Sequence, residues 1–144
     1  MSDALVKPPV WFRIVSVLLL LWGVMGVFAF YTDVTMSEAS LAALDDYDRA
    51  LYLGRPAWFA TVYGLATWGA FLGAVALLLR RRLAVVLFLF SAVAVVVQFG
   101  WVFGVTDLIA QKGAWTAIFP LVILAIAIFQ LWFANLAHKR GWLA

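Results

Sequence analysis

Four long apolar runs constrain this chain more than any other feature of its sequence. They cover residues 10–31, 57–79, 83–105 and 114–137 of the 144-residue chain. An α-helix rises about 1.5 Å per residue, so about 20 residues cross a hydrocarbon core of about 30 Å, and each run is long enough. We therefore expect an all-α integral membrane protein: a single domain in which the four runs form an up-down-up-down bundle of transmembrane helices.

The composition excludes an ordinary soluble fold. Hydrophobic residues make up 67% of the chain and charged residues 12%, whereas soluble domains are roughly half apolar and about a quarter charged. The net charge of +3 comes from cations at the ends of the runs and not from a basic patch, so we predict no binding to nucleic acid. Cysteine is absent, which excludes disulfides, thiolate metal sites and thiol nucleophiles.

The cations predict the orientation of the bundle, because basic residues are retained on the cytoplasmic side of a membrane. One side of the expected bundle carries Lys7, Arg13, Arg80, Arg81, Arg82, Lys139 and Arg140. The other side carries only Arg49, Arg55 and Lys112, together with most of the acidic residues. We interpret the triple arginine as a topology signal, and we expect both termini in the cytoplasm and an acidic surface outside.

The connection between the first two runs has a helical pattern of its own. Residues 35–38 have the spacing of a capping box, and Gly54 supplies a stop. The helical face between them is apolar, with Leu41, Leu44, Tyr47 and Leu51. We expect a short amphipathic helix over residues 36–53, with an Asp45–Arg49 pair on its wet face. The sequence leaves open whether this acidic helix is a lid over the bundle or a docking surface for a partner.

Two pairs of glycines indicate close packing between helices. Gly69 and Gly73 make one side of the second run smooth, and Gly100 and Gly104 do the same near the outer end of the third run. Small residues at this spacing let helix backbones approach each other closely. We expect close helix contacts at both pairs, either inside the bundle or between subunits.

A few polar and aromatic side chains fall deep within the runs, where each needs a partner away from water. They are Gln98, Gln130, Tyr63, Trp22 and Trp68. Trp22 and Trp68 lie near the middle of their runs, so we expect both to face the bundle and not the lipid. The two glutamines differ in depth and cannot bond each other. Each therefore either bonds a neighbouring helix or helps to line a path for a polar solute.

No residue pattern indicates catalysis. No Asp, Glu, Lys or His lies deep in any run, which argues against a proton-coupled exchanger that needs a carboxylate inside the membrane. The single histidine, His138, cannot supply both axial ligands of a membrane haem. Motifs of hydrolases, phosphate loops and zinc sites are missing as well. We predict no enzyme activity, no catalytic residue, no cofactor and no metal.

Four short motifs at the ends of the runs resemble those of a group of small bacterial inner-membrane proteins. The motifs are Pro8-Pro9-Val10-Trp11-Phe12, Val34-Thr35-Met36-Ser37, Arg55-Pro56-Ala57-Trp58 and Arg140-Gly141-Trp142-Leu143. The members of that group are four-helix proteins without an established function, and some carry a sugar-transporter label. The resemblance implies a multi-pass protein of a bacterial inner membrane and brings no functional residue with it.

Two hypotheses of function follow. By elimination, the first is a non-enzymatic accessory or scaffold subunit in the lipid bilayer, which packs against copies of itself or other membrane proteins through the glycine faces and the outer helix. The second is a small-solute or sugar-like transporter, which with only four helices would work as an oligomer. A transporter predicts that four deep side chains converge on one water-accessible cavity: Gln98, Trp68, Tyr63 and Trp22. A scaffold predicts that they are satisfied in a dry core.

Overall fold

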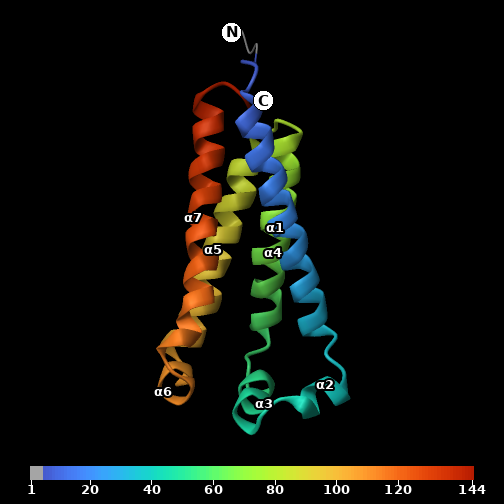
Figure 1. Cartoon of the computed structure of the whole chain (residues 1–144), viewed down its shortest axis with the longest axis vertical. Helices are drawn as coiled ribbons and strands as arrows, with labels where there is room; N and C mark the ends of the chain where they lie inside the picture. Colours follow the sequence, from blue (N-terminus) through green and yellow to red (C-terminus); the bar gives the residue numbers. More distant parts are fainter. Residues whose placement is uncertain (1–4) are drawn as a thin grey trace.

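The computed structural model describes residues 5–144, and every regular element in that part of the chain is helical. The long helices are α1 (Val10–Val34), α4 (Trp58–Leu78), α5 (Leu83–Gly104) and α7 (Ile118–Lys139). The short ones are α2 (Glu38–Ala43), α3 (Asp46–Leu53), α6 (Leu108–Lys112) and a 3-10 turn, Ala114–Ala117. Figure 1 shows the long helices running up and down in turn, which confirms the four-helix bundle.

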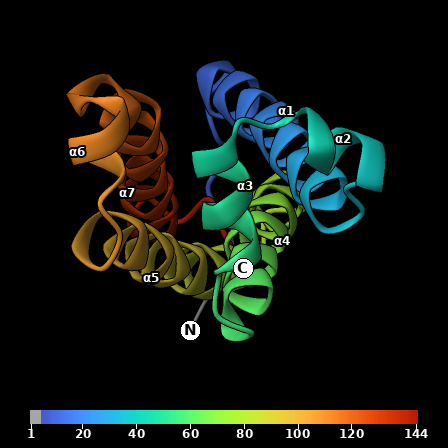
Figure 2. The same cartoon turned by 90° about the horizontal axis from the view of Figure 1, so that it is seen from below.

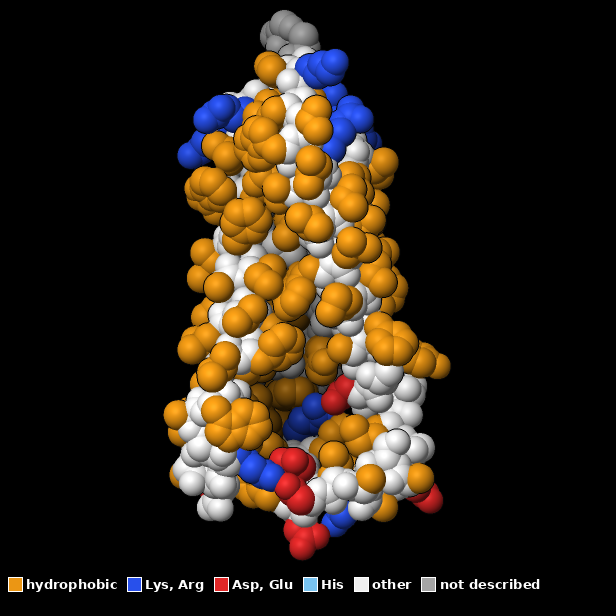
Figure 3. Space-filling view, viewed as in Figure 1, with side chains coloured by type: hydrophobic (Ala, Val, Ile, Leu, Met, Phe, Trp, Pro, Cys, Tyr) orange, Lys and Arg blue, Asp and Glu red, His pale blue; other side chains and the backbone are white. Residues whose placement is uncertain are grey.

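The two ends of the bundle differ in charge. The end that we call the basic end holds the described parts of both chain termini and the α4–α5 turn with Arg80, Arg81 and Arg82. The other end, which we call the acidic end, holds α2, α3 and α6. Between them Figure 3 shows a belt of hydrophobic side chains. All four long helices are long and apolar enough to cross a membrane, so the structure is that of a multi-pass membrane protein.

The last span becomes an α-helix later than its apolar run begins. Residues 114–117 form a 3-10 turn, and α7 starts at Ile118. A proline ring clashes with the carbonyl four residues before it, so an α-helix cannot run from residue 114 through Pro120. The start at Ile118 places Pro120 in the first turn of α7, where its missing N–H has no helical partner in any case.

The long helices pack in the order α1, α4, α5, α7, so α4 and α5 lie in the middle and α1 and α7 stand at the two edges. The edge helices do not pack along their length, and Figure 2 shows their backbones apart; the space-filling view in Figure 3 is hollowed on this side. They meet near the basic end, where the Phe12 and Phe133 rings stack with centroids 5.6 Å apart. The bundle is therefore open on one side over the half nearer the acidic end.

Gly69 and Gly73 let α4 and α5 come close. A Cβ atom at Gly73 would lie 2.5 Å from the Phe88 ring, which fills the space that the glycine leaves. Gly69 faces Ser91, whose hydroxyl donates a hydrogen bond to the Ala66 carbonyl at 2.6 Å. The contact expected at this pair lies inside the bundle.

Gly100 and Gly104 make no such contact within the chain. A Cβ atom added at either position would meet no other atom within 4 Å. Both glycines lie on the exposed side of α5 near the acidic end. Within the described residues this pair therefore makes no close contact inside the bundle, because that side of α5 is exposed, and the alternative of a contact between subunits stays a prediction.

Arg80 does more than signal topology, because it binds the two ends of the chain to the α4–α5 turn. Its Nε donates to the Trp142 carbonyl at 2.9 Å, and its Nη2 donates to the Val6 carbonyl at 2.7 Å. Its own carbonyl accepts from the Ala144 N–H at 2.8 Å. The residue has a φ of 55°, in the left-handed region that costs energy for any residue except glycine. These bonds close the basic end.

The outer connection forms two short helices where the sequence predicts one over residues 36–53. After α2 ends at Ala43, the Asp45 side chain accepts a hydrogen bond from the Asp48 backbone N–H at 2.7 Å and starts α3. An aspartate at this position stabilises the start of a new helix, which breaks the longer one. The predicted single helix is therefore wrong, and so is the predicted Asp45–Arg49 pair.

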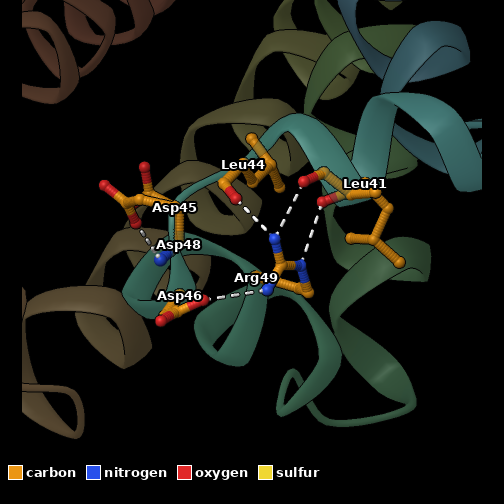
Figure 4. Close-up of polar contacts among 7 residues, drawn as sticks. Leu41, Leu44, Asp45, Asp46, Asp48 and Arg49 are labelled. Atoms are coloured by element: carbon orange, nitrogen blue, oxygen red, sulfur yellow. Dashed lines mark hydrogen bonds and ion pairs between the residues drawn. The ribbon is translucent and has the colours of Figure 1, made fainter.

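Arg49 instead occupies the break between α2 and α3, as Figure 4 shows. Its guanidinium donates to the carbonyls of Leu41, Ala42 and Leu44 and forms an ion pair with Asp46 at 3.1 Å. The last carbonyls of a helix lack helical partners, so these bonds satisfy the end of α2. They also fix the angle at which α3 leaves it.

Candidate functional site: a cavity within the bundle

A cavity of about 190 Å³ lies inside the bundle, with walls from all four long helices. On α7 the lining residues are Phe119, Ile123, Ala127 and Gln130, which recur every three or four residues and so share one face. Small residues such as Gly26, Ala66 and Ala70 line the other helices and leave the volume unfilled. Most of the wall is apolar, and its polar side chains are Trp22, Tyr63, Thr67, Ser91, Gln98 and Gln130.

Both glutamines are buried polar groups of the cavity. Gln130 is 1% exposed and Gln98 is 7% exposed. Counted from the basic ends of α7 and α5, Gln130 lies about 9 Å nearer to that end than Gln98, six residues at about 1.5 Å each. Gln130 therefore lies at the inner end of the cavity, and Gln98 lies toward the acidic end.

The hydrogen bond that we expected from Gln130 to a neighbouring helix is not made by its amide nitrogen. Within residues 5–144, Gln130 Nε2 has no hydrogen-bond partner although it is fully buried. The hydroxyls on the wall use backbone carbonyls: Ser91 bonds the Ala66 carbonyl, and Thr67 bonds the carbonyls of Tyr63 and Gly64. The buried Nε2 is therefore a free donor, and Gln130 is one of the residues that line the apolar cavity.

The two mid-span tryptophans differ in orientation. Trp22 lies on the cavity wall, as does Tyr63. Trp68 is 44% exposed and its ring contacts Phe71 on its own helix, so the expectation that it faces the bundle is wrong. α4 is apolar on nearly every side, so its sequence does not indicate which side faces the bundle. An indole ring is stable either in the bundle or in contact with lipid. Thr67, four residues after Tyr63 and therefore on the same face of α4, also lies on the cavity wall.

The inner end of the cavity is closed by a dry core. Phe12, Leu77, Phe88, Phe133 and Trp142 are all buried there and belong to one hydrophobic cluster. Arg80 also binds Val6 and Trp142 to this region, so the described residues pack the cavity closed toward the basic end.

The open side of the cavity lies between α1 and α7. Figure 3 shows this face of the molecule hollowed in its lower part, just above a cluster of charged side chains. Across the opening, the rings of Trp22 and Phe119 meet edge to face with centroids 6.5 Å apart. Both residues line the cavity, so this aromatic contact stands where the cavity meets the membrane.

A second, open recess of about 500 Å³ adjoins the cavity at the acidic end. It shares Ala29 and Tyr63 with the cavity, and its other residues are mainly hydroxyl or carboxylate side chains, including Thr32, Asp33 and Ser37. The apolar cavity thus passes into a polar recess near the end of α1.

The acidic end is covered by α3, which lies across the mouth of the bundle in Figure 2. The Tyr47 hydroxyl of α3 donates to Asp107 at 2.7 Å. Lys112 of α6 forms ion pairs with Asp45 and, at 3.7 Å, with Asp48. We call α3, α6 and these contacts the acidic cover. It joins the connection after α1 to the connection after α5.

The acidic cover is also fixed to the end of α1. The Tyr52 hydroxyl donates to the Asp33 carbonyl at 2.7 Å, and the Arg55 guanidinium pairs with the Asp33 carboxylate at 2.8 Å. The same guanidinium lies over the Tyr52 ring, 4.2 Å from its centroid. The cover therefore has attachments on both sides of the mouth.

These contacts shift the pKa values of the groups that form them. The hydrogen bond from Lys112 lowers the pKa of Asp45, and the hydrogen bond from Tyr47 lowers the pKa of Asp107. Asp45 raises the pKa of Lys112 in turn. Desolvation, and then the bond to Asp107, raises the pKa of Tyr47 to about 12. All four groups thus keep the protonation states that hold the acidic cover together over a wide range around neutral pH.

Comparisons with protein-family models, with curated proteins and with solved structures found no match for this chain. The resemblance to small bacterial inner-membrane proteins therefore stays a prediction. Within residues 5–144, no group of three or more His, Asp or Glu side chains is placed to hold a metal ion. The chemistry of the residues that line the cavity is therefore the basis for inferring a function.

Proposed function

We propose that this protein is a non-enzymatic carrier that binds a small, largely apolar solute with a hydrogen-bonding group inside its bundle. The observation that supports the proposal most strongly is the unpaired Gln130 Nε2, fully buried against a cavity of about 190 Å³. A buried polar group without a partner costs about 1–3 kcal/mol. A bound solute that accepts its hydrogen bond would remove this cost.

The cavity favours a solute less polar than a sugar. A monosaccharide carries a hydroxyl on nearly every carbon, and each needs a partner in a site without water. Ser91 and Thr67 already donate to backbone carbonyls, so the polar side chains left for a ligand on this mostly apolar wall are Trp22, Tyr63, Gln98 and Gln130. Because all the walls come from one chain, binding itself requires no second copy of the protein.

Ligand-dependent unfolding of the purified protein in lipid-bilayer discs tests this proposal. A molecule that binds the folded state raises the unfolding temperature. We expect benzene-sized compounds with one polar group to raise it for the wild type, and to do so less for Gln130→Leu. The matched control is Gln111→Leu, the same substitution at an exposed position of α6. If no compound stabilises the wild type and none is retained in equilibrium dialysis, the proposal is wrong.

A role as an accessory or scaffold subunit is the second candidate. The observation that favours it is the open space beside Gly100 and Gly104, where a partner helix could approach α5 closely. This role predicts that the protein leaves its own membrane in a defined larger complex after gentle extraction. A monomer without other polypeptides would contradict it.

We further propose the orientation in which both termini and the basic end face the cytoplasm of a bacterial inner membrane. The supporting observation is that Arg80, Arg81 and Arg82 lie together with the termini, because basic residues are retained inside. Single cysteines introduced at residues 81 and 46 of this cysteine-free chain test it. An impermeant thiol reagent added to intact cells should label only residue 46, and the reverse pattern would overturn the orientation.

A further inference from the structure

We propose that the solute enters from the bilayer through the opening between α1 and α7, and that it is a ring compound with an apolar chain and a hydrogen-bond acceptor for Gln130. This inference rests on the proposed function and adds to it the class of ligand and its route.

The acceptor follows from the free donor at the inner end of the cavity. Among residues 5–144, Gln130 Nε2 is an N–H donor without a partner, and an amide nitrogen accepts no hydrogen bond. The ligand must therefore present an oxygen that accepts, such as a carbonyl. A saturated hydrocarbon would leave the donor unpaired.

The ring follows from the size of the cavity. An engineered protein cavity of about 150 Å³ lined by apolar residues holds benzene. The cavity of about 190 Å³ between α1 and α7 therefore has room for a benzene-sized ring with a carbonyl substituent, but not for a long chain as well. A chain attached to the ring must leave through the open side into the hydrocarbon of the bilayer.

The route follows from which sides are closed. The cluster around Phe88 and Phe133 closes the inner end, and α4 and α5 pack tightly behind the cavity through Gly69 and Gly73. At the acidic end the cavity passes into a recess of hydroxyl and carboxylate side chains, which does not suit an apolar chain. The acidic cover beside this recess spans the mouth and is attached to α1 by a hydrogen bond and an ion pair. Beside the cavity, by contrast, the α1–α7 side is crossed by the edge-to-face contact of Trp22 with Phe119, and the other aromatic contacts of α1 with α7 lie near the basic end. Opening this side requires no polar bond to break.

Three probes in lipid-bilayer discs test the class of ligand. They are para-octylacetophenone, which has the ring, acceptor and chain, octylbenzene, which lacks the acceptor, and acetophenone, which lacks the chain. We expect the wild type to bind the first probe most tightly. Gln130→Leu should weaken it about threefold to tenfold, the loss of one hydrogen bond, and should leave octylbenzene unchanged. Gln111→Leu, the control outside the cavity, should change neither.

The outcomes separate this inference from the proposed function. If none of the three probes binds the wild type, the carrier function itself fails. If octylbenzene binds as tightly as para-octylacetophenone, or if Gln130→Leu affects both equally, the carrier function stands and the acceptor is wrong.

Two variants with opposite expectations test the route. Phe119→Ala removes an aromatic pair worth about 0.5–1.5 kcal/mol, which should speed association of para-octylacetophenone about twofold to tenfold. Lys112→Ala loosens the acidic cover and should leave the rate unchanged. Phe119→Leu serves as a milder variant if Phe119→Ala folds poorly. Faster association in Lys112→Ala together with an unchanged rate in the Phe119 variants would place the entrance at the acidic end and overturn the route.

Discussion

Gln130→Leu should make the ligand-free protein more stable, which is unusual for a substitution at a fully buried position. Gln130 is 1% exposed, and its Nε2 has no partner among residues 5–144. Most buried substitutions destabilise because they create a void or remove a satisfied bond. Leucine has nearly the volume of glutamine, so it leaves no void, and it removes a donor that is desolvated without compensation.

The expected gain can be bounded from both sides. An unsatisfied buried amide costs about 1–3 kcal/mol, but polar groups within membranes also find partners in the unfolded reference state, and measured interhelical bonds average about 0.6 kcal/mol. We expect a gain of about 1–2 kcal/mol in the free energy of unfolding. For a chain of this size 1 kcal/mol corresponds to about 3 °C, so the unfolding temperature should rise by about 3–6 °C.

The assay is thermal unfolding of protein freed of bound small molecules, followed by circular dichroism at the same detergent concentration for each variant. Gln111→Leu should leave the unfolding temperature within about 1 °C, since exposed substitutions change stability little. A fall of several degrees in Gln130→Leu would mean that the carboxamide makes stabilising bonds in the folded protein. Gln130 would then be a structural residue, and the free donor on which the carrier proposal depends would not exist.

Three further predictions concern packing, the chain ends and the acidic cover. Gly73→Ala should destabilise the protein by about 1–3 kcal/mol, because the added Cβ would lie 2.5 Å from the Phe88 ring. Gly100→Ala should be neutral or stabilising by up to about 1 kcal/mol. Equal effects of the two variants in chemical unfolding would contradict this packing. Arg80→Lys keeps the charge but should expose the C-terminal segment to carboxypeptidase, because a lysine cannot bond the Val6 and Trp142 carbonyls together. A C-terminal segment as well protected as in the wild type would refute the role of the Arg80 side chain in holding the chain ends. Asp107→Asn should lower the pKa of Tyr47 from about 12 toward its ordinary value in an absorbance titration, and an unchanged value would exclude the Tyr47–Asp107 bond.

The pH dependence of the acidic cover has a definite sign. The pKa values of Asp45 and Asp107 are lowered, so their contribution is fully present above the ordinary value of 3.8 and is lost as the pH falls through the lowered values. The pKa values of Lys112 and Tyr47 are raised. Their contribution to the stability of the acidic cover is therefore fully present below a pH of about 10 and is lost as the pH rises through the raised values. Between these limits protease cleavage in the α2–α3 connection should not change with pH, and a change near neutral pH would contradict the assignment.

The spans were predictable because length and apolarity alone determine which segments cross a membrane. Both features are local in the sequence, and the four long helices lie close to the predicted ranges. The side of a helix that faces the bundle is a different question. A helix that is apolar all round carries no periodic signal, so the outward orientation of Trp68 on α4 could not be read from its depth.

The remaining differences arise from contacts between segments that lie far apart in the sequence. Asp45 could pair within its helix or cap a new one, and its ion pair with Lys112 across the mouth favours the second. Arg80 could signal orientation alone, but its bonds to Val6 and Trp142 exist only once the chain ends meet. The sequence places Gln98, Gln130, Tyr63 and Trp22 within the spans, and only the fold shows that they line one cavity.

Native mass spectrometry of the protein, extracted gently from its own membrane, tests the central claim most directly. We expect the wild type to carry one small molecule per chain whose fragments contain a carbonyl group, and Gln130→Leu purified in the same way to carry less of it. A wild type without any bound small molecule, or one whose bound molecule is retained equally by Gln130→Leu, would contradict the claim that the cavity is a binding site organised around Gln130.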